Sequence, residues 1–324
     1  MNKYEFYPER AYNEIKAHWE KWAQLVKAKG WVVGISGGKD STVVAALAAK
    51  IFGAEKVLGI MMPNGEQKDI KDSEEVCKCL GIKSVVVNIG KAYEELLDEV
   101  TYGALKECGI DKAHPDTITN MPARLRMTAL YAVAQSLGYM VLNTCNLSED
   151  VCGYATLGGD NMGSYAPIQG LTVSEIRILG DWLGLPFHLV HKTPIDGLQP
   201  LSDEDKLGFT YADLDRYIRE DIGNPNFKEK IDGIYRRNKF KTEIVRIPHP
   251  DFDYLGNFVR YNNLPGVMRG PIEDCYKVYR HRHCIYWSGD HCARTKGNCC
   301  PKECNEYREY NSMVFGEWQK RRGE

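Results

Sequence analysis

A short glycine-rich segment, Gly34–Ser41, is the part of this chain whose residue types and spacing are best suited to binding phosphate. It follows an apolar run, Trp31–Ile35, and leads into an alanine- and valine-rich run, Thr42–Phe52, which ends at Gly53. A turn between a buried strand and a helix aims free backbone N–H groups and the positive end of the helix at one point. We therefore predict a phosphate-binding loop at this position.

Asp40 indicates that a metal ion accompanies the phosphate, because a carboxylate beside bare phosphate would repel it and Mg²⁺ between the two removes the conflict. Gly37 and Gly38 let the backbone approach the ligand closely. Ser36 and Ser41 add hydroxyl donors. The alternative is a plain glycine turn with a capping aspartate. The segment does not have the Walker spacing, in which a glycine and four spacers precede Gly-Lys-Ser/Thr.

Alternating strand and helix patterns around this loop predict the fold. Apolar runs predict strands at 31–35, 57–62, 84–89 and 139–143, and Leu189–Val190 is a candidate for a short fifth strand. Helical spacing predicts helices within residues 1–30 and at 42–52, 69–80, 93–105, 124–137 and 173–183, with a polar loop at 109–119. This alternation is typical of a doubly wound α/β fold, a parallel sheet with helices on both faces. Ligands then bind at the carboxyl ends of the strands.

Length, composition and charge limit the possible functions. The 324 residues can hold one large α/β domain with an appendage, or two domains. No apolar run approaches the roughly 20 residues that a membrane span needs. The first residues have no apolar signal core, so we expect a cytoplasmic protein. A net charge of −2 argues against broad nucleic-acid affinity.

The last part of the chain differs in composition from the rest. Residues 1–230 carry 25 Lys and Arg against 32 Asp and Glu, whereas residues 231–324 carry 17 against 12. We therefore predict a main domain at 1–245 and a basic, Cys/His-rich extension at 246–324. Six of the 11 cysteines lie in this extension: Cys275, Cys284, Cys292, Cys299, Cys300 and Cys304.

The spacing of these six cysteines leaves their role open between a structural Zn²⁺ site, free buried thiols, disulfides and an iron–sulfur cluster. Paired Cys-x2-Cys knuckles are missing, which weakens the zinc signal. A cytosolic location disfavours disulfides, and no ferredoxin spacing occurs. The basic and aromatic residues among the cysteines have the composition of a nucleic-acid contact, but we favour an exposed cap on the acidic main domain.

Further motifs follow the phosphate loop in a definite order. They are Met62–Gly65, Asn120–Met127, Asn143–Glu149, Gly153–Tyr154, Gly159–Asp160, Pro167–Ile168 and Asp203–Tyr211. The loop alone resembles that of the ATP pyrophosphatases. With the later motifs, the chain resembles the ammonia-using NAD synthetases over residues from about 10 to 245. The resemblance implies an adenine nucleotide alpha hydrolase-like fold.

The resemblance also implies a reaction. In this family, ATP adenylylates the carboxylate of nicotinic acid adenine dinucleotide, pyrophosphate leaves, and ammonia then displaces AMP to give NAD⁺. A carboxylate is a poor electrophile until a good leaving group is attached, and two anions must first be brought together. Mg²⁺ and cationic side chains reduce the repulsion and stabilise the charge on the leaving pyrophosphate.

Carried over to this sequence, the family pattern gives expected roles to individual residues. Asp40, Glu149 and Lys39 are the expected catalytic residues, and the two carboxylates are the expected Mg²⁺ ligands. The expected ATP contacts are Gly34, Ile35, Ser36, Gly37, Gly38, Lys39, Asp40, Ser41, Met62 and Thr144. The expected dinucleotide contacts are Asn120, Arg124, Asp160 and Lys241, and Arg126 can assist.

Some of these assignments have a simpler alternative. Glu149 could be a first-turn acid that the helix dipole favours, and Arg124 an exposed helix arginine. Asp203 and Glu204 could shape the ammonia site or form a solvated turn. Lys241 lies where the family has a His-Lys pair, but Phe240 precedes it here.

Four positions depart from the family pattern on the substrate side: Leu157, Ser164, Val173 and Ile195. Leu157 stands where a lysine or arginine is usual and Ser164 where an aspartate is usual, so they can be a coupled loss of opposite charges. Losing one good charged contact weakens binding by roughly 1–3 kcal/mol. We therefore expect a less charged nicotinate pocket and a raised KM for the dinucleotide.

The expected partners are small molecules, namely ATP, nicotinic acid adenine dinucleotide and free ammonia, because no glutamine-hydrolysing module precedes Gly34. The resemblance further implies a homodimer. A second hypothesis is a tRNA-modifying ATP pyrophosphatase, which Lys39 and the cysteine-rich extension favour and the 120–126 and 143–149 motifs oppose. A third is a binding protein without catalysis, which the retention of Asp40 and Glu149 opposes.

Overall fold

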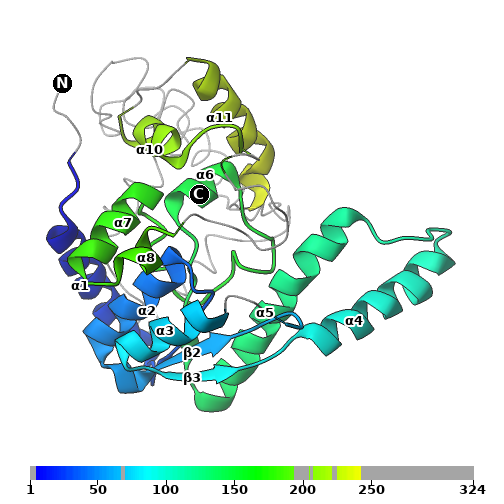
Figure 1. The fold of residues 1–324 in the computed structure, drawn as a ribbon, viewed down its shortest axis with the longest axis horizontal. Coiled ribbons are helices and arrows are strands. Elements are labelled where there is room, and N and C mark those ends of the chain that lie inside the picture. Colours follow the sequence, from blue (N-terminus) through cyan, green and yellow to red (C-terminus); the bar gives the residue numbers. More distant parts are fainter. Residues whose placement is uncertain (1–4, 67–69, 193–203, 205–206, 221–224, 242–324) are drawn as a thin grey trace, which may run out of the picture. The chain divides into compact units, whose positions relative to one another are not determined.

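The computed structural model of this chain describes residues 5–66, 70–192, 204, 207–220 and 225–241 (Figure 1). All of them lie in the first of the two units into which the chain divides, Met1–Arg246. The Cys/His-rich extension at 246–324, with its six cysteines and the proposed zinc site, lies outside the described residues. The domain boundary at 245 stays a prediction.

Four parallel strands form one sheet in the order β3-β2-β1-β4, which confirms the expected parallel α/β class. They are β1 (Trp31–Gly34), β2 (Val57–Met61), β3 (Lys83–Val86) and β4 (Met140–Val141). The chain passes from β1 to β2 and β3 on one side, and β4 pairs with the other side of β1. The loops that follow β1 and β4 therefore diverge at a topological switch point, where α/β sheets bind ligands.

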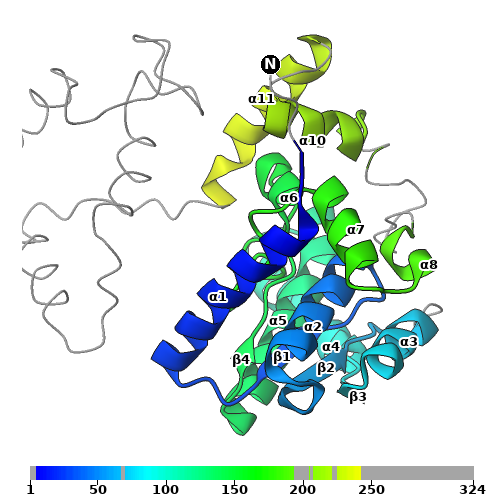
Figure 2. The same ribbon diagram turned by 90° about the vertical axis from the view of Figure 1, so that its left-hand side faces the viewer.

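Helices cover both faces of this sheet, as the doubly wound pattern predicts (Figures 1 and 2). On one face lie α1 (Pro8–Val26), α2 (Lys39–Phe52), α3 (Ile70–Leu80), α7 (Val173–Trp182) and α8 (Phe187–Val190). The other face packs against α5 (Pro115–Leu137), and α4 (Gly90–Asp98) continues into a π-helix at Glu99–Leu105. The remaining helices are α6 (Leu147–Cys152), α10 (Tyr211–Glu220) and α11 (Pro225–Asn238), with 3₁₀ turns at Ala54–Lys56 and Lys239–Lys241. None of the described helices is both long and apolar enough to cross a membrane.

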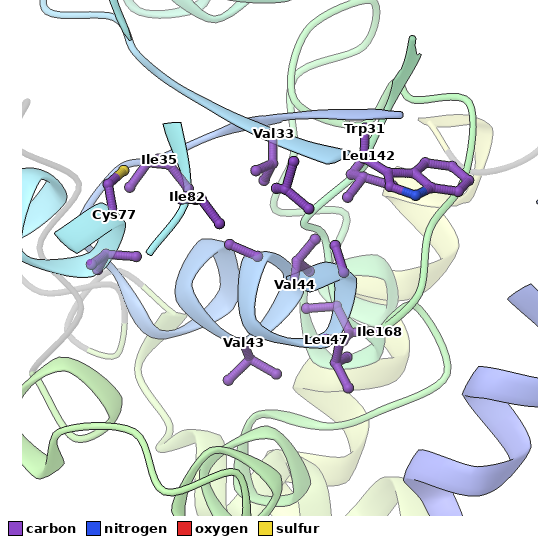
Figure 3. Packing of buried hydrophobic residues seen from close by; sticks show 14 of the residues in the cluster. Trp31, Val33, Ile35, Val43, Val44, Leu47, Cys77, Ile82, Leu142 and Ile168 are labelled. Carbon is purple, nitrogen blue, oxygen red and sulfur yellow. The ribbon is translucent and has the colours of Figure 1, made fainter. Parts of the chain in front are cut away.

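The core around α2 fixes the position of the glycine-rich loop. Alternate residues of β1 point to opposite faces, so Trp31 and Val33 pack on the α2 side while Val32 packs on the α5 side. The small apolar residues of α2, such as Val43 and Val44, are completely buried beneath the sheet (Figure 3). Each Å² of apolar surface buried in this core stabilises the packing by about 25 cal/mol. The core therefore fixes β1 and α2 on either side of the loop.

The fold differs from the sequence prediction at two places. Leu189–Val190 belongs to the helical turn α8 and not to a fifth strand, because a buried apolar pair has no period that separates the two states. The polar loop expected at 109–119 is also wrong in its second half, since α5 begins at Pro115. Proline suits the first helical position, and His114 caps the helix by accepting from the Asp116 N–H.

Candidate active site

The glycine-rich loop leads from β1 directly into α2, and its backbone requires glycine at one point. Gly37 has φ +77°, and a Cβ there would lie 2.9 Å from the Cβ of Asp72 and 3.2 Å from the backbone nitrogen of Ser73. Gly38 is the N-cap of α2, and it supplies no side-chain cap. The N–H groups that open α2 are therefore directed at the loop without a side-chain acceptor, which is the arrangement that binds phosphate.

The hydroxyl groups of the loop hold its shape. Ser36 Oγ lies 3.1 Å from Ser41 Oγ and accepts from the Gly38 N–H at 3.3 Å. Ser41 and Thr42 both donate to the Gly38 carbonyl, at 3.1 and 2.8 Å. Both serines of the expected ATP site thus face the inside of the loop, and their contacts with ATP stay predictions.

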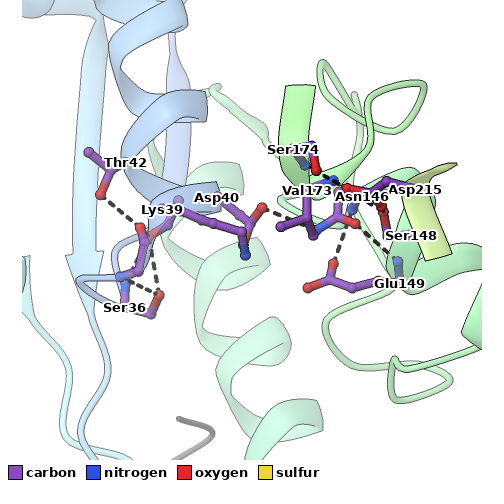
Figure 4. Close-up of polar contacts among 12 residues, drawn as sticks. Ser36, Lys39, Asp40, Thr42, Asn146, Ser148, Glu149, Val173, Ser174 and Asp215 are labelled. Carbon is purple, nitrogen blue, oxygen red and sulfur yellow. Dashed lines mark hydrogen bonds and ion pairs between the residues drawn. The ribbon is translucent and has the colours of Figure 1, made fainter. Parts of the chain in front are cut away.

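Two carboxylates from different loops meet beside this turn. Asp40 lies in the first turn of α2, after β1, and Glu149 lies in the first turn of α6, after β4. Asn146 connects them: its Nδ2 donates to Asp40 Oδ1 at 3.1 Å, and its Oδ1 accepts from the Glu149 N–H at 3.0 Å (Figure 4). The fold therefore brings the two expected Mg²⁺ ligands into one cluster.

The charged groups of this cluster shift each other's pKa values. Burial, and then the carboxylate of Asp40, raises the pKa of Glu149 well above its usual value. Lys39 Nζ lies 2.8 Å from Asp40 Oδ2 and is buried. Burial alone would lower the pKa of Lys39, but the carboxylates of Asp40 and Glu149 outweigh it and raise the pKa. The guanidinium of Arg177 also acts on Lys39 and lowers its pKa. The raised pKa of Glu149 nevertheless means that the cluster favours added positive charge, from a proton or from a metal ion.

Mg²⁺ fits this donor set. It prefers oxygen ligands and is usually held by one or two carboxylates together with substrate phosphates and water. Within the described ranges, no group of three or more His, Cys, Asp and Glu side chains could hold a metal ion by itself. Asp40 and Glu149 next to a phosphate loop match a site in which protein carboxylates and nucleotide phosphates would together supply the ligands of the metal ion.

Two expected dinucleotide contacts come from α5 and touch the loop that follows α6. Asn120 Oδ1 accepts a hydrogen bond of 2.7 Å from the Thr156 hydroxyl. Arg124 Nε donates to the Leu157 carbonyl at 3.1 Å, while the side chain of Arg124 is otherwise exposed. The loop thus lies against α5 through these two residues.

The other two expected dinucleotide contacts lie on the same loop or reach it. Asp160 Oδ1 accepts from the Thr156 N–H at 2.7 Å, and burial raises the pKa of Asp160. Lys241 Nζ donates to the Gly153 carbonyl at 2.8 Å, and the carbonyl of Lys241 accepts from Asn161 Nδ2 at 3.1 Å. All four residues therefore surround one loop, and their roles in binding stay predictions.

Met62 and Thr144, the remaining expected ATP contacts, follow β2 and β4. Met62 is buried next to Gly34, where an added Cβ would lie 3.0 Å from its Cε. Its carbonyl accepts from Arg126 Nε at 3.0 Å, so Arg126 joins α5 to the end of β2. Thr144 is partly buried in the loop before Asn146.

Of the four positions that depart from the family pattern, three lie in the described part of the chain, and each has a local structural environment. The Leu157 side chain is 48% exposed, and it is the backbone carbonyl of this residue that Arg124 contacts. Ser164 Oγ accepts from the Val141 N–H at 3.3 Å, at the edge of β4. Val173 is fully buried at the start of α7, and Ile195 lies outside the described residues.

Of the two acidic residues Asp203 and Glu204, the structure describes Glu204 and gives it a hydrogen-bond partner. Glu204 Oε1 accepts from the N–H of Tyr211, the first residue of α10, at 2.9 Å. This contact gives Glu204 a structural role at the start of α10, which neither the ammonia site nor the solvated turn anticipated. Asp203 lies outside the described residues.

Sequence reasoning gave no role to the residues that hold α6 in place. Ser148 donates to Asp215 Oδ1 at 2.6 Å, and Asp215 Oδ2 accepts from the Ser174 N–H at 2.7 Å, so α10 ties α6 to α7 (Figure 4). The capping-box spacing from Asn146 to Glu149 was a visible signal. The contact between Asn146 and Asp40 had no signal, because 106 residues separate them.

Comparison with known proteins identifies the family of this chain. Residues 11–246 match the family model described as NAD synthase. The NH₃-dependent NAD⁺ synthetase of Thermococcus kodakarensis is 36% identical over 230 residues, which cover 66% of this chain and 87% of that protein. Among solved structures, the NMN synthetase of Francisella tularensis is 30% identical with a TM-score of 0.67, covering 76% of this chain and 100% of that one.

The NH₃-dependent NAD synthetase of Campylobacter jejuni is 22% identical with a TM-score of 0.59, and it covers 76% of this chain and 100% of its own length. At that identity the likeness shows the fold alone. The family model covers most of the chain, and the curated relative matches over nearly all of its own length. This chain belongs to the NAD synthase family.

Proposed function

We propose that this protein is an ammonia-dependent NAD⁺ synthetase, which joins ammonia to the carboxylate of nicotinic acid adenine dinucleotide at the expense of ATP. The observation that carries the proposal is the meeting of Asp40 and Glu149 beside the glycine-rich loop. The 36% identity to the Thermococcus enzyme supports the choice of reaction. The same family match favours this hypothesis over tRNA modification.

In the first step, a carboxylate oxygen of the dinucleotide forms a bond to the α-phosphorus of ATP. The bond from that phosphorus to the bridging oxygen breaks, and pyrophosphate leaves with the electron pair. The N–H groups at the start of α2 and the ammonium of Lys39 bind the departing charge. Mg²⁺, held by Asp40 and Glu149 when bound, supplies charge neutralisation and orientation of the phosphates.

In the second step, the nitrogen of ammonia forms a bond to the activated carbonyl carbon. The bond from that carbon to the AMP oxygen breaks, AMP leaves, and the nitrogen loses a proton to water. The loop that follows α6, which Asn120, Arg124, Asp160 and Lys241 surround, is where we place the nicotinate end. Holding both substrates next to each other on the protein makes the attack effectively intramolecular.

A second candidate substrate is nicotinic acid mononucleotide, whose amidation would give NMN. The likeness to the Francisella NMN synthetase favours it. The uncharged Leu157 and Ser164 on the substrate side are compatible with a smaller ligand. We place the dinucleotide first because the curated relatives at 36% identity are NAD⁺ synthetases.

We expect ammonium to support product formation by the purified chain and glutamine alone to give none, because no described cysteine lies in a recognisable thiol-hydrolase context. NAD⁺ and NMN are quantified by mass spectrometry with the dinucleotide and the mononucleotide as parallel substrates. A higher kcat/KM for the mononucleotide would replace the first candidate by the second. Equal rates with ammonia-free glutamine would contradict the assigned nitrogen donor.

We also propose that the protein is a homodimer in which a second copy covers the arm formed by α4, the π-helix and the start of α5. This arm extends away from the sheet (Figure 1). Along residues 91–120 no side chain is buried, and Tyr102 is 70% exposed. Light scattering on the full chain is expected to give a mass of twice the 36.8 kDa of one chain. The Tyr102→Glu variant, which places a charge in the proposed interface, is expected to have the mass of a single chain. A monomeric wild-type protein would contradict this proposal.

A further inference from the structure

Asn146 occupies the space between the two carboxylates of the cluster. It is the N-cap of α6, and its side chain is completely buried. Its Oδ1 accepts from the Glu149 N–H at 3.0 Å, and Glu149 Oε2 accepts in return from the Asn146 N–H at 3.0 Å. On the opposite side, Asn146 Nδ2 donates to Asp40 Oδ1 at 3.1 Å. One side chain thus contacts both residues.

These contacts determine which way the amide of Asn146 points. Its oxygen must face the Glu149 N–H, and its nitrogen must face the Asp40 carboxylate, because the reverse would place two acceptors and two donors against each other. Asn146 therefore engages one oxygen of each carboxylate, Oδ1 of Asp40 and Oε2 of Glu149, while Lys39 pairs with Oδ2 of Asp40. Glu149 keeps its second oxygen for a ligand, and the two residues are held at a fixed separation.

Capping α6 does not by itself require asparagine. Serine, threonine, aspartate and asparagine are comparable N-caps. The other capping box of the described chain, at the start of α7, uses Thr172 with Glu175. A hydroxyl also donates and accepts, but from a single atom on a short side chain, whereas the amide of asparagine places its acceptor and its donor on separate atoms that cap the helix and reach a second carboxylate. Asparagine at position 146 therefore suits both the contact with Asp40 and the capping of α6.

We propose that Asn146 is a positioning residue that sets the placement of Asp40 relative to Glu149 and thereby the geometry of the Mg²⁺ site. The inference rests on the proposed function, because it assumes that these two carboxylates bind the metal. Partners that orient metal ligands through hydrogen bonds typically change metal affinity 10- to 100-fold when they are removed. Asn146 acts on both ligands together.

The test compares wild type with Asn146→Ser in the full-length protein. Serine keeps an N-cap oxygen but is too short to reach Asp40. Binding of Mn²⁺ in the presence of α,β-methylene-ATP, without dinucleotide or ammonia, is measured by electron paramagnetic resonance. We expect the Mn²⁺ affinity to fall by about 10- to 100-fold. In steady-state assays the Mg²⁺ concentration for half-maximal rate should rise by a similar factor.

Asn88→Ser is the matched control. Asn88, in the loop after β3, also bridges two segments, since its Oδ1 accepts from the Gly65 and Gly90 N–H groups, but its hydrogen bonds involve neither Asp40 nor Glu149. We expect Mn²⁺ affinity to be unchanged in this variant. Asn146→Thr, which also keeps a cap, replaces the serine variant if that protein does not fold.

Unchanged Mn²⁺ affinity in the Asn146 variant, with a lowered unfolding temperature, would overturn the proposal and leave only a structural cap. Failure of the wild type to bind Mn²⁺ with the nucleotide analogue would overturn it as well. A different result would contradict the proposed function without contradicting the role of Asn146. If wild type binds Mn²⁺ and the variant does not, but no NAD⁺ forms, the bridge stands and the substrate assignment falls.

Discussion

Asp40→Asn and Glu149→Gln are each expected to abolish turnover while the protein stays folded. Each change removes one negative charge from the cluster that faces the phosphate loop. Loss of a metal ligand costs several kcal/mol of transition-state stabilisation, and about 4 kcal/mol corresponds to roughly a thousandfold lower rate. The initial rate of pyrophosphate release at saturating Mg²⁺ measures the effect.

Glu149→Gln has a matched control elsewhere in the chain. Glutamine preserves the capping box of α6, so the fold should be retained. Glu175 occupies the equivalent position in the capping box of α7 and pairs with Arg219 at 2.6 Å. Glu175→Gln should lower stability but leave the rate near that of wild type. Retention of about a tenth or more of the activity by either site variant would show that the metal assignment is wrong.

Gly37→Ala is expected to raise the KM for ATP strongly. The φ of +77° is unfavourable for alanine by about 1–2 kcal/mol. The new Cβ would also lie 2.9 Å from the Cβ of Asp72, so the loop must shift away from the phosphate position. Steady-state kinetics with varied ATP and thermal unfolding of the free protein separate binding from stability.

Gly81→Ala is the control for this substitution. Gly81 ends α3 with φ +65°, and an added Cβ there meets no atom within 4 Å. Both variants should lose similar stability from the backbone strain, but only Gly37→Ala should lose ATP affinity. A KM for ATP equal to that of wild type in Gly37→Ala would mean that the loop does not bind the phosphates.

The sequence predicts the parts of this fold that depend on local patterns. The strand from Trp31, the helix that ends before Gly53 and the loop between them lie where apolar runs and glycine stops indicate them. The start of α5 is missed because residues 109–119 are polar and show no apolar helical spacing, whereas the structure extends the helix back to Pro115 through a buried Pro122. Tertiary burial overrides the local helix-breaking tendency there.

In the candidate site, the sequence likewise indicates the residues that belong to local motifs but not the contacts between distant segments. Asp40 and Glu149 are found because each belongs to a recognisable motif after a strand. The bridge through Asn146 cannot be read from either motif, because it depends on β4 pairing with β1 and not with the edge strand β3. Family patterns mark Leu157 as a lost charge, but only the structure shows that Arg124 contacts its backbone carbonyl.

The central claim is that this chain activates a carboxylate by transferring AMP to it, and oxygen-18 in that carboxylate tests it most directly. Nicotinic acid adenine dinucleotide labelled in both carboxylate oxygens is incubated with the purified chain, ATP, Mg²⁺ and ammonium. Mass spectrometry of the products should find one labelled oxygen in AMP and none in pyrophosphate, because the carboxylate oxygen bonded to phosphorus leaves with AMP. Unlabelled AMP, or no AMP that depends on the dinucleotide, would contradict the account.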